Sequence, residues 1–214
     1  MTKVLFVKGN PKSTEQSYSL RLGQSFVDVY AAENPGAQVT ELDLYESNIP
    51  LIDAEVMTAW GKLAQQSELS HHEAAKVLRL GELVDQFLDS DVIVFAAPMW
   101  NFGYPPMVKA YMDAIAVAGK TFQYTATGPV GLAVGKKAFI TEARGGVWSA
   151  GPMVSMEHSQ SHLRAFLGFL GVTDVQVLLA EGLNFDPSKG EEILAEAVAR
   201  AQQAAKAQPV AATV

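Results

Sequence analysis

The chain has 214 residues, of which 49% are apolar and 18% charged, a composition typical of a folded globular protein and not of a disordered one. Its 16 Lys and Arg residues against 23 Asp and Glu give a net charge of −7 at pH 7, which disfavours nucleic acid or an anionic membrane as the main partner. The sequence has no cysteine. Disulfides, thiolate nucleophiles, cysteine-ligated zinc and iron–sulfur clusters are therefore excluded, and redox chemistry would need a bound cofactor.

The length suits one large domain, and there is no internal repeat, low-complexity linker or break in composition. We predict a single domain over residues 1–214, with about 208–214 as a frayed tail. The apolar run at residues 4–7 is too short for a signal peptide, and no segment approaches the roughly 20 apolar residues that span a bilayer. We expect a soluble, cytoplasmic protein.

Apolar runs and helical periodicities alternate along the chain. Strands are predicted at five short apolar runs: 4–7, 39–44, 92–97, 138–141 and 175–179. Helices are predicted at five segments: 17–32, 68–88, 107–117, 156–170 and 187–207. The segment 47–67 is mixed, and 121–135, with its glycines and Pro129, predicts a loop or a short hairpin.

This alternation predicts the fold class. Apolar strands separated by helices form a parallel sheet that is covered on both faces. The right-handed crossover rule then favours a doubly wound α/β fold, a three-layer sandwich with a five-stranded parallel sheet. Ligands of such sheets bind outside the carboxyl ends of the strands. A ligand site is therefore expected among the connections that follow the first, third and fourth strands.

The first of these connections, 9–19, is rich in hydroxyl groups and leads directly into a helix. It matches neither the dinucleotide nor the nucleoside-triphosphate fingerprint. Free N–H groups at a helix N-terminus, together with Ser and Thr hydroxyls, can hold one phosphate without a lysine. The alternative is that Ser17 only caps the helix.

The other two connections suit a flat ring. Residues 97–106 combine Trp100, Phe102 and Tyr104 with an asparagine, and a flat heterocycle binds an apolar face with a few placed amides. Residues 142–148 contain paired glycines beside Arg144, which permit close backbone approach to a ligand. A covered sheet end, an oligomer contact or an ordinary glycine turn would explain each connection alone, but together they predict one site.

Other chemistries fit less well. No acidic residue follows the first strand, as a phosphoacceptor receiver domain would need, and no GxSxG occurs for an α/β-hydrolase. His158 and His162 are spaced to share a helical face, but the glutamate of an HExxH zinc site is absent between them. We interpret them as a solvated surface pair.

At this point the sequence resembles the FMN-dependent NADH-azoreductases, which are also NADH:quinone reductases with a flavodoxin-like fold. The resemblance runs from Lys3 to about Gly182. Its motifs are Gln16-Ser17-Tyr18-Ser19, Ala97-Pro98-Met99-Trp100-Asn101-Phe102, Thr121-Phe122-Gln123-Tyr124-Thr125, Gly128-Pro129, Gly135-Lys136-Lys137-Ala138, Arg144-Gly145-Gly146 and Phe166-Leu167-Gly168-Phe169-Leu170-Gly171-Val172-Thr173-Asp174.

The resemblance implies a set of site residues. The FMN phosphate would be surrounded by Asn10, Ser17, Tyr18 and Ser19. The isoalloxazine ring would be lined by Met99, Trp100, Asn101, Phe102, Ala143, Arg144, Gly145 and Gly146. An aromatic substrate pocket would be formed by Phe102, Tyr124 and Phe166. The family often has Ser where Ala143 stands and Tyr where Trp100 stands, so a side-chain hydrogen bond at position 143 is lost.

The resemblance also implies a ping-pong reaction. NADH would pass a hydride to bound FMN, and an azo compound or quinone would then take the same place and receive two electrons. FMN would carry the chemistry, with no catalytic side chain and no metal, and backbone amides would stabilise the reduced ring. The family forms homodimers with both sites at the interface. Three alternatives remain open: a flavodoxin-type electron carrier, a quinone reductase that prefers NADPH, and a flavin-free interaction protein.

Overall fold

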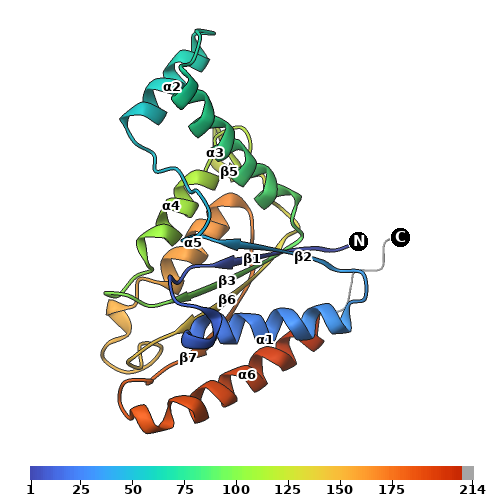
Figure 1. Cartoon of the computed structure of the whole chain (residues 1–214), viewed down its shortest axis with the longest axis vertical. Helices are drawn as coiled ribbons and strands as arrows, with labels where there is room; N and C mark the ends of the chain where they lie inside the picture. The colour runs from blue at the N-terminus through green and yellow to red at the C-terminus, as the bar shows by residue number, and fades with distance from the viewer. Residues whose placement is uncertain (209–214) are drawn as a thin grey trace.

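Five parallel strands form the central sheet of the structure, a computed structural model that describes residues 1–208 (Figure 1). Their order across the sheet is β2-β1-β3-β6-β7. Their bounds are β1 (Lys3–Lys8), β2 (Gln38–Asp43), β3 (Val92–Pro98), β6 (Lys137–Ala143) and β7 (Asp174–Ala180). The register sets Val4 of β1 between Val39 of β2 and Val92 of β3. The predicted α/β fold with a five-stranded parallel sheet is confirmed.

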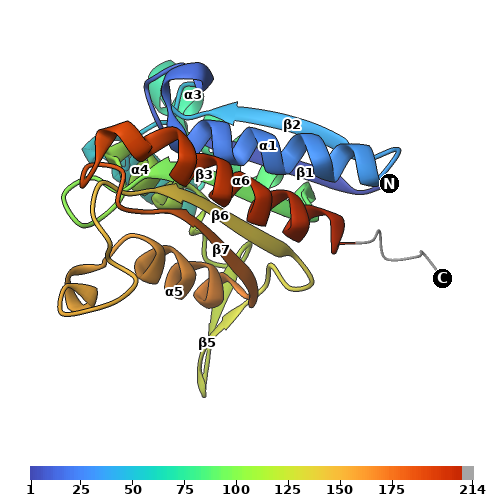
Figure 2. The same cartoon turned by 90° about the horizontal axis from the view of Figure 1, so that it is seen from below.

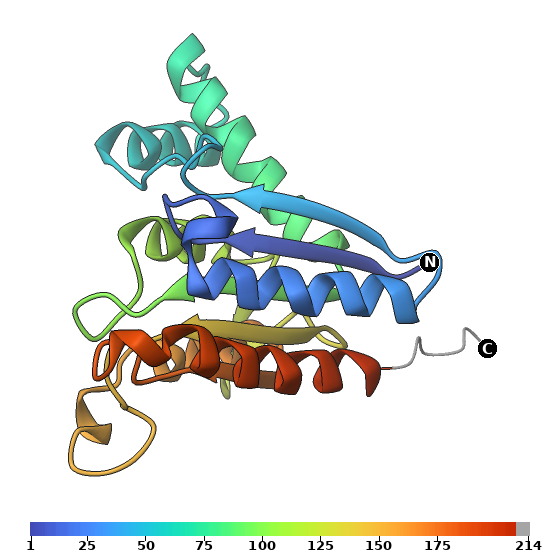
Figure 3. The same cartoon turned by 60° about the horizontal axis from the view of Figure 1, so that its bottom comes forward.

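Helices cover both faces of this sheet. On one face, α1 (Tyr18–Glu33) and α6 (Gly190–Lys206) lie side by side (Figure 3). The other face packs against α3 (His71–Asp89), α4 (Pro106–Ile115) and α5 (Gln160–Leu170). Because side chains alternate along a strand, Val4 and Phe6 join the core under α1 and α6, while Leu5 and Val7 join the opposite core.

Two elements extend from these layers. The segment 47–67, which the sequence pattern left unassigned, contains α2 (Ala54–Ala64), and α2 rises above the sheet together with the first turns of α3 (Figure 1). The hairpin of β4 (Phe122–Thr125) and β5 (Gly128–Gly131) projects from the side of the sheet that carries α5 (Figure 2). The loop or hairpin expected at 121–135 is therefore a hairpin.

Several predicted boundaries are wrong. The helix expected at 156–170 is a short 3-10 turn, η2 (Val154–Met156), followed by α5 from Gln160, so His158 and His162 do not share a helix. Glu157 causes the break, because its carboxylate accepts hydrogen bonds from the N–H groups of Ser159 and Gln160. Likewise, the helix expected at 187–207 starts with a 3-10 turn, η3 (Pro187–Lys189), before α6 begins.

The end of the described chain also differs from the prediction. Gln208, where a frayed tail was expected to begin, is buried and accepts a hydrogen bond from Lys137 Nζ at 2.7 Å. Residues 209–214 of that prediction lie outside the described residues. Over residues 1–208, no helix has both the length and the apolar character needed to cross a membrane.

Candidate functional site

A pocket of about 370 Å³ opens at the carboxyl edge of the sheet, beside the ends of β1, β3 and β6. The strand order reverses at β1, because β2 lies on one side of it and β3 on the other, and ligands of doubly wound sheets bind at this switch point. The residues that line the pocket are Asn10, Lys12, Gln16, Ser17, Tyr18, Ser19, Pro98, Met99, Trp100, Ala143, Arg144, Gly145, Leu183 and Asn184. They come from four separate connections.

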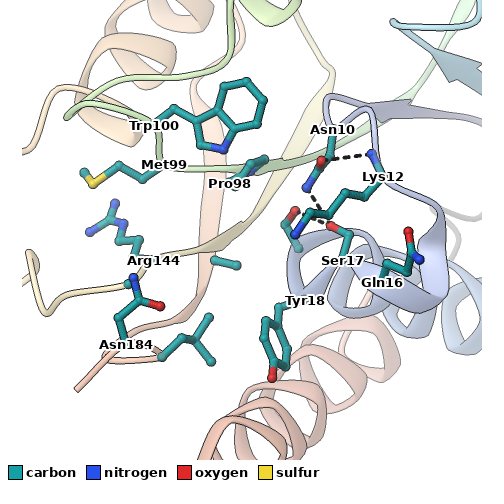
Figure 4. Close-up of a pocket in the computed structure, with 14 residues that line it drawn as sticks. Asn10, Lys12, Gln16, Ser17, Tyr18, Pro98, Met99, Trp100, Arg144 and Asn184 are labelled. Carbon is teal, nitrogen blue, oxygen red and sulfur yellow. Dashed lines mark hydrogen bonds between the residues drawn. The ribbon is translucent and has the colours of Figure 1, made fainter. Parts of the chain in front are cut away.

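The β1–α1 connection forms one end of the pocket (Figure 4). Asn10 Nδ2 donates to Ser17 Oγ at 2.8 Å, while Asn10 Oδ1 accepts from the N–H of Lys12 at 3.1 Å. Ser17 caps α1 by accepting from the N–H of Leu20, and its hydroxyl lies 3.1 Å from that of Ser19. Ser17 therefore caps the helix, and the same side chain is also placed to contact a phosphate, so the two interpretations do not exclude each other.

The first turn of α1 gives this end of the pocket the chemistry that suits an anion. The N–H groups of Tyr18 and Ser19 open the helix, where no intrahelical acceptor exists, and the helix dipole favours negative charge there. Lys12 adds a cation, since its side chain extends toward Ser17 (Figure 4). The sequence reasoning missed Lys12, although it stands in the same connection.

The β3–α4 connection contains a tight turn at residues 100–103. Trp100 and Gly103 exchange backbone hydrogen bonds of 2.8 and 3.0 Å, so Asn101 and Phe102 form the tip. Both have left-handed backbone conformations, with φ of 47° and 72°. Asparagine adopts this conformation readily, whereas it is rare for a bulky residue and stores strain at Phe102. The turn is held by the N–H of His158, which donates to the Phe102 carbonyl at 2.9 Å.

Aromatic surface remains open at this turn. The side chains of Trp100 and Phe102 are 40% and 39% exposed, and Phe102 packs edge to face on Trp148 at a ring separation of 5.4 Å. Exposed aromatic faces beside a pocket can stack on a flat ligand.

Close packing of the connection after β6 explains why it contains paired glycines. A Cβ at Gly145 would overlap the side chain of Asn184, and one at Gly146 would lie 2.8 Å from Trp148 Nε1. The backbone is fixed there because the N–H of Asn184 donates to the Gly145 carbonyl at 2.9 Å. Glycine at position 145 therefore lets this connection lie against residues 183–184, which form the opposite wall, without displacing the Asn184 side chain.

Arg144 faces away from the anion-binding end of the pocket (Figure 4). Its side chain is fully buried and contacts three glutamates: Nε lies 2.5 Å from Glu142, Nη1 2.8 Å from Glu181, and Nη2 3.3 Å from Glu157. Burial opposes ionisation of Glu181, but hydrogen bonds from Ser149, Trp148 and Arg144 hold its pKa below the usual value. The guanidinium thus stabilises the walls, and the part of Arg144 left to meet a ligand is its backbone.

The structure brings most of the predicted residues to this pocket. Asn101, Phe102 and Gly146 belong to the same connections but do not line it. Tyr124 and Phe166 lie elsewhere, on the β4–β5 hairpin and on α5. The lining residues that sequence reasoning missed are Lys12, Gln16, Pro98, Leu183 and Asn184. Among residues 1–208, no three His, Asp or Glu side chains converge as a metal site.

The two ends of the pocket differ in chemistry. Hydroxyls, free N–H groups and Lys12 lie at one end, while Met99, Trp100 and the glycine connection lie at the other. A ligand that joins a phosphate to a flat ring fits both ends. A flavin mononucleotide has this form, and the close approach permitted at Gly145 suits its ring.

Comparisons with known proteins agree with this geometry. A family model described as "Flavodoxin-like fold" matches residues 2–205. The chain is 46% identical over 209 residues to an FMN-dependent NADH:quinone oxidoreductase of Bacillus velezensis, covering 96% of this chain and 99% of that protein. A Geobacillus kaustophilus protein of the same name is 48% identical over 208 residues, with the same coverage.

A solved structure gives the same result. The FMN-dependent NADH-azoreductase of Bacillus anthracis, crystallised in complex with FMN, superimposes with a TM-score of 0.91 at 32% identity and covers 97% of this chain and 99% of that one. With 46–48% identity to the two quinone oxidoreductases over nearly the whole length, the chain belongs to the family of FMN-dependent NADH:quinone oxidoreductases and azoreductases with the flavodoxin-like fold.

Proposed function

We propose that the chain is an FMN-dependent NADH oxidoreductase that reduces azo compounds and quinones in a two-electron, ping-pong reaction. The observation that carries the proposal is the two-ended pocket at the switch point of the sheet, in a chain that matches FMN-dependent relatives over 96% of its length. Bound FMN supplies hydride acceptance from NADH and two-electron transfer to the second substrate.

The protein binds and orients the cofactor. Ser17, Ser19 and the N–H groups at the start of α1 hold the phosphate, with Lys12 beside them. Met99, Trp100 and Gly145, which line the other end of the pocket, would hold the ring. Gly145 lines the pocket, so its backbone N–H group would favour negative charge on the ring. No side chain needs to act as an acid, because water can protonate the product.

Steady-state kinetics test the reaction scheme. If both substrates use the same face of the flavin in turn, double-reciprocal plots of rate against NADH at several fixed quinone concentrations give parallel lines. Intersecting lines would show that both substrates bind together and would contradict the ping-pong scheme. Repeating the assay with NADPH settles the donor preference.

Ser17→Ala tests the phosphate end. The variant loses both the helix cap and a phosphate donor, so we expect stability to fall by about 1 kcal/mol and FMN affinity to fall roughly tenfold. Affinity for riboflavin, which lacks the phosphate, should change little. Ser67→Ala, at an exposed position that does not line the pocket, is the matched control. An equal loss of affinity for FMN and for riboflavin would show that Ser17 does not contact the phosphate.

A flavodoxin-type electron carrier is the second candidate function. The α2–α3 extension and the β4–β5 hairpin go beyond what a minimal five-stranded carrier needs, and the relatives' names specify NADH and quinone. Both features favour the enzyme.

We further propose a homodimer whose sites are completed by the partner subunit. Tyr124 is 75% exposed at the end of the projecting hairpin and does not line the pocket of its own chain. Exposed apolar side chains also gather on and before α2, namely Leu51, Met57, Trp60 and Leu63. Apolar groups left in water in this way suit burial against a second copy.

Subunit mixing tests this arrangement. Tyr124→Ala should keep FMN but raise KM for the acceptor, whereas Gly145→Val should lack FMN. If Tyr124 acts on the partner's flavin, exchange of subunits between the two variants rebuilds one complete site per mixed dimer and restores activity. No recovery after proven exchange, or a monomer in sedimentation equilibrium, would contradict the proposal.

We also place the enzyme in the cytoplasm, where NADH is regenerated. Small molecules are its substrates, with neither nucleic acid nor membrane as a partner, in keeping with its net charge of −7.

A further inference from the structure

A buried ionic cluster lies behind the pocket and joins its walls. It consists of Arg144 and the three glutamates already described, together with Ser159 and Tyr104. The side chains of Arg144 and Glu142 are fully buried, and those of Glu157 and Glu181 are 6% and 12% exposed. One cation therefore faces three carboxyl groups away from water, an arrangement that is costly if all three are ionised.

Ser159 is the informative member of this cluster. Its Oγ lies 2.6 Å from Oε1 of Glu142 and also 2.6 Å from Oε1 of Glu157. A hydroxyl group has one hydrogen to donate, so it can satisfy only one of two ionised carboxylates. The second contact is a hydrogen bond only if one of the two glutamates carries a proton and donates it to Ser159.

Glu157 is well placed to be the ionised member. It lies at the N-terminus of α5 and accepts from the N–H groups of Ser159, Gln160 and Ser161. Burial opposes its ionisation, but these contacts with Ser159 and the charge of Arg144 hold its pKa below the usual value. Glu181 likewise accepts from the N–H groups of Trp148 and Ser149.

Glu142 has no backbone donor among the described residues. Its Oε1 accepts from Arg144 Nε at 2.5 Å and also lies 2.6 Å from the Ser159 hydroxyl, so a proton given to Ser159 is carried on the oxygen that faces Arg144. Its Oε2 lies 2.6 Å from the Tyr104 hydroxyl. Burial raises its pKa above the usual value despite the nearby guanidinium. These groups, with Glu157 and Glu181, are the charged and titratable side chains of the cluster, and they come from the connections around β3, β6, α5 and β7.

We propose that Glu142 is protonated and acts as a positioning residue. It donates a hydrogen bond to Ser159, and Ser159 donates one to Glu157. This chain of hydrogen bonds fixes the connections that line the flavin pocket. Tyr104 follows the strained turn at residues 100–103, and Arg144 follows Ala143 into the pocket wall. Loss of the proton would leave two carboxylates in contact with one hydroxyl and would loosen both walls. The claim that this cluster affects flavin binding rests on the proposed function, whereas the claim that Glu142 is protonated does not.

Unfolding equilibria of the whole protein test the proton. Glu142→Gln keeps the shape of a neutral carboxyl group. A group that is protonated in the folded state and ionised in the unfolded state stabilises the protein at low pH, and this contribution is lost as the pH rises toward its folded-state pKa. The ratio of the wild-type unfolding constant to that of Glu142→Gln should therefore rise as the pH passes above the usual carboxyl pKa, by at most about tenfold per pH unit, and should level off above the folded-state pKa of Glu142.

Glu181→Gln is the matched control. It removes an ionised partner of Arg144, so above the usual carboxyl pKa we expect destabilisation by a constant amount and a flat ratio. If Glu142 is ionised, its variant will behave in the same way as Glu181→Gln, and the proposal is overturned. Infrared spectra give a second measurement, because the carbonyl stretch of a protonated carboxyl group should vanish in Glu142→Gln and persist in Glu181→Gln.

FMN titration tests the positioning role. At alkaline pH the dissociation constant of the wild type should rise relative to that of Glu142→Gln, which cannot lose its neutral group. If the ratio of the two dissociation constants stayed constant with pH, Glu142 would affect only the stability of the protein, and its positioning role would be overturned. If neither protein bound FMN, the proposed function would fail, yet the unfolding ratios would still decide whether Glu142 holds a proton.

Discussion

Replacing Gly145 with valine should remove FMN from the protein and abolish NADH oxidation. The new Cβ would overlap the side chain of Asn184, which lines the pocket. The Asn184 amide would have to swing away while its backbone N–H stays bonded to the Gly145 carbonyl, so the valine and the displaced amide both crowd the pocket wall. Overpacking of this kind costs about 1–3 kcal/mol, so we expect FMN affinity to fall on the order of 100-fold. Absorbance of the purified protein and titration with FMN measure the effect.

Gly61→Val is a matched control for that change. Gly61 lies on α2, away from the pocket, and a Cβ there meets no atom within 4 Å. This variant should keep the flavin. A yellow, active Gly145→Val protein would show that the connection after β6 does not contact the ring.

Gly23→Leu should destabilise the fold and weaken cofactor binding together. Gly23 is the point where α1 lies closest to the sheet: a Cβ would lie 2.7 Å from Ala96 Cβ, 2.8 Å from the ring of Phe6 and 2.9 Å from Thr141 Oγ1. These atoms belong to three strands of the sheet and cannot withdraw independently. We expect a loss of about 3 kcal/mol in the free energy of unfolding, measured by urea titration.

Cofactor binding should fall with it because the helix that Gly23 anchors presents Ser17, Tyr18 and Ser19 to the phosphate. Gly81→Leu on α3 provides the comparison, since no atom lies within 4 Å of its Cβ and leucine favours a helix more than glycine does. Equal stabilities for the two variants would mean that α1 has room to move away from the sheet.

The sheet could be predicted from the sequence because burial on both faces leaves short runs without polar residues. The run at 92–97 is one example, and it is buried throughout as the centre of the sheet. Once the strands are parallel, their carboxyl ends share one edge. The convergence of the connections after β1, β3 and β6 on one pocket followed from this rule.

Helix α2 could not be predicted because it does not pack on the sheet. Only Val56 and Ala59 are buried along its length, while Met57, Trp60 and Leu63 are apolar and exposed. The apolar residues Val56, Trp60 and Leu63 recur at helical spacing, but only Val56 of the three is buried, so the pattern does not match a face packed on the sheet.

The role of Arg144 could not be predicted for a different reason. The position of Arg144 beside two glycines suggested that its side chain contacts a ligand. Its actual partners, Glu142, Glu157 and Glu181, come from separate segments and meet only in the folded chain. The wall made by Leu183 and Asn184 was missed in the same way, because the connection after β7 carries no motif.

The most direct test of the flavoenzyme assignment is anaerobic titration of the purified, FMN-loaded protein with NADH. One equivalent of NADH per bound FMN should bleach the flavin absorbance, and a quinone or azo dye added afterwards should restore it without further NADH. A protein that binds no FMN, or whose bound flavin stays oxidised in excess NADH and NADPH, would contradict the assignment.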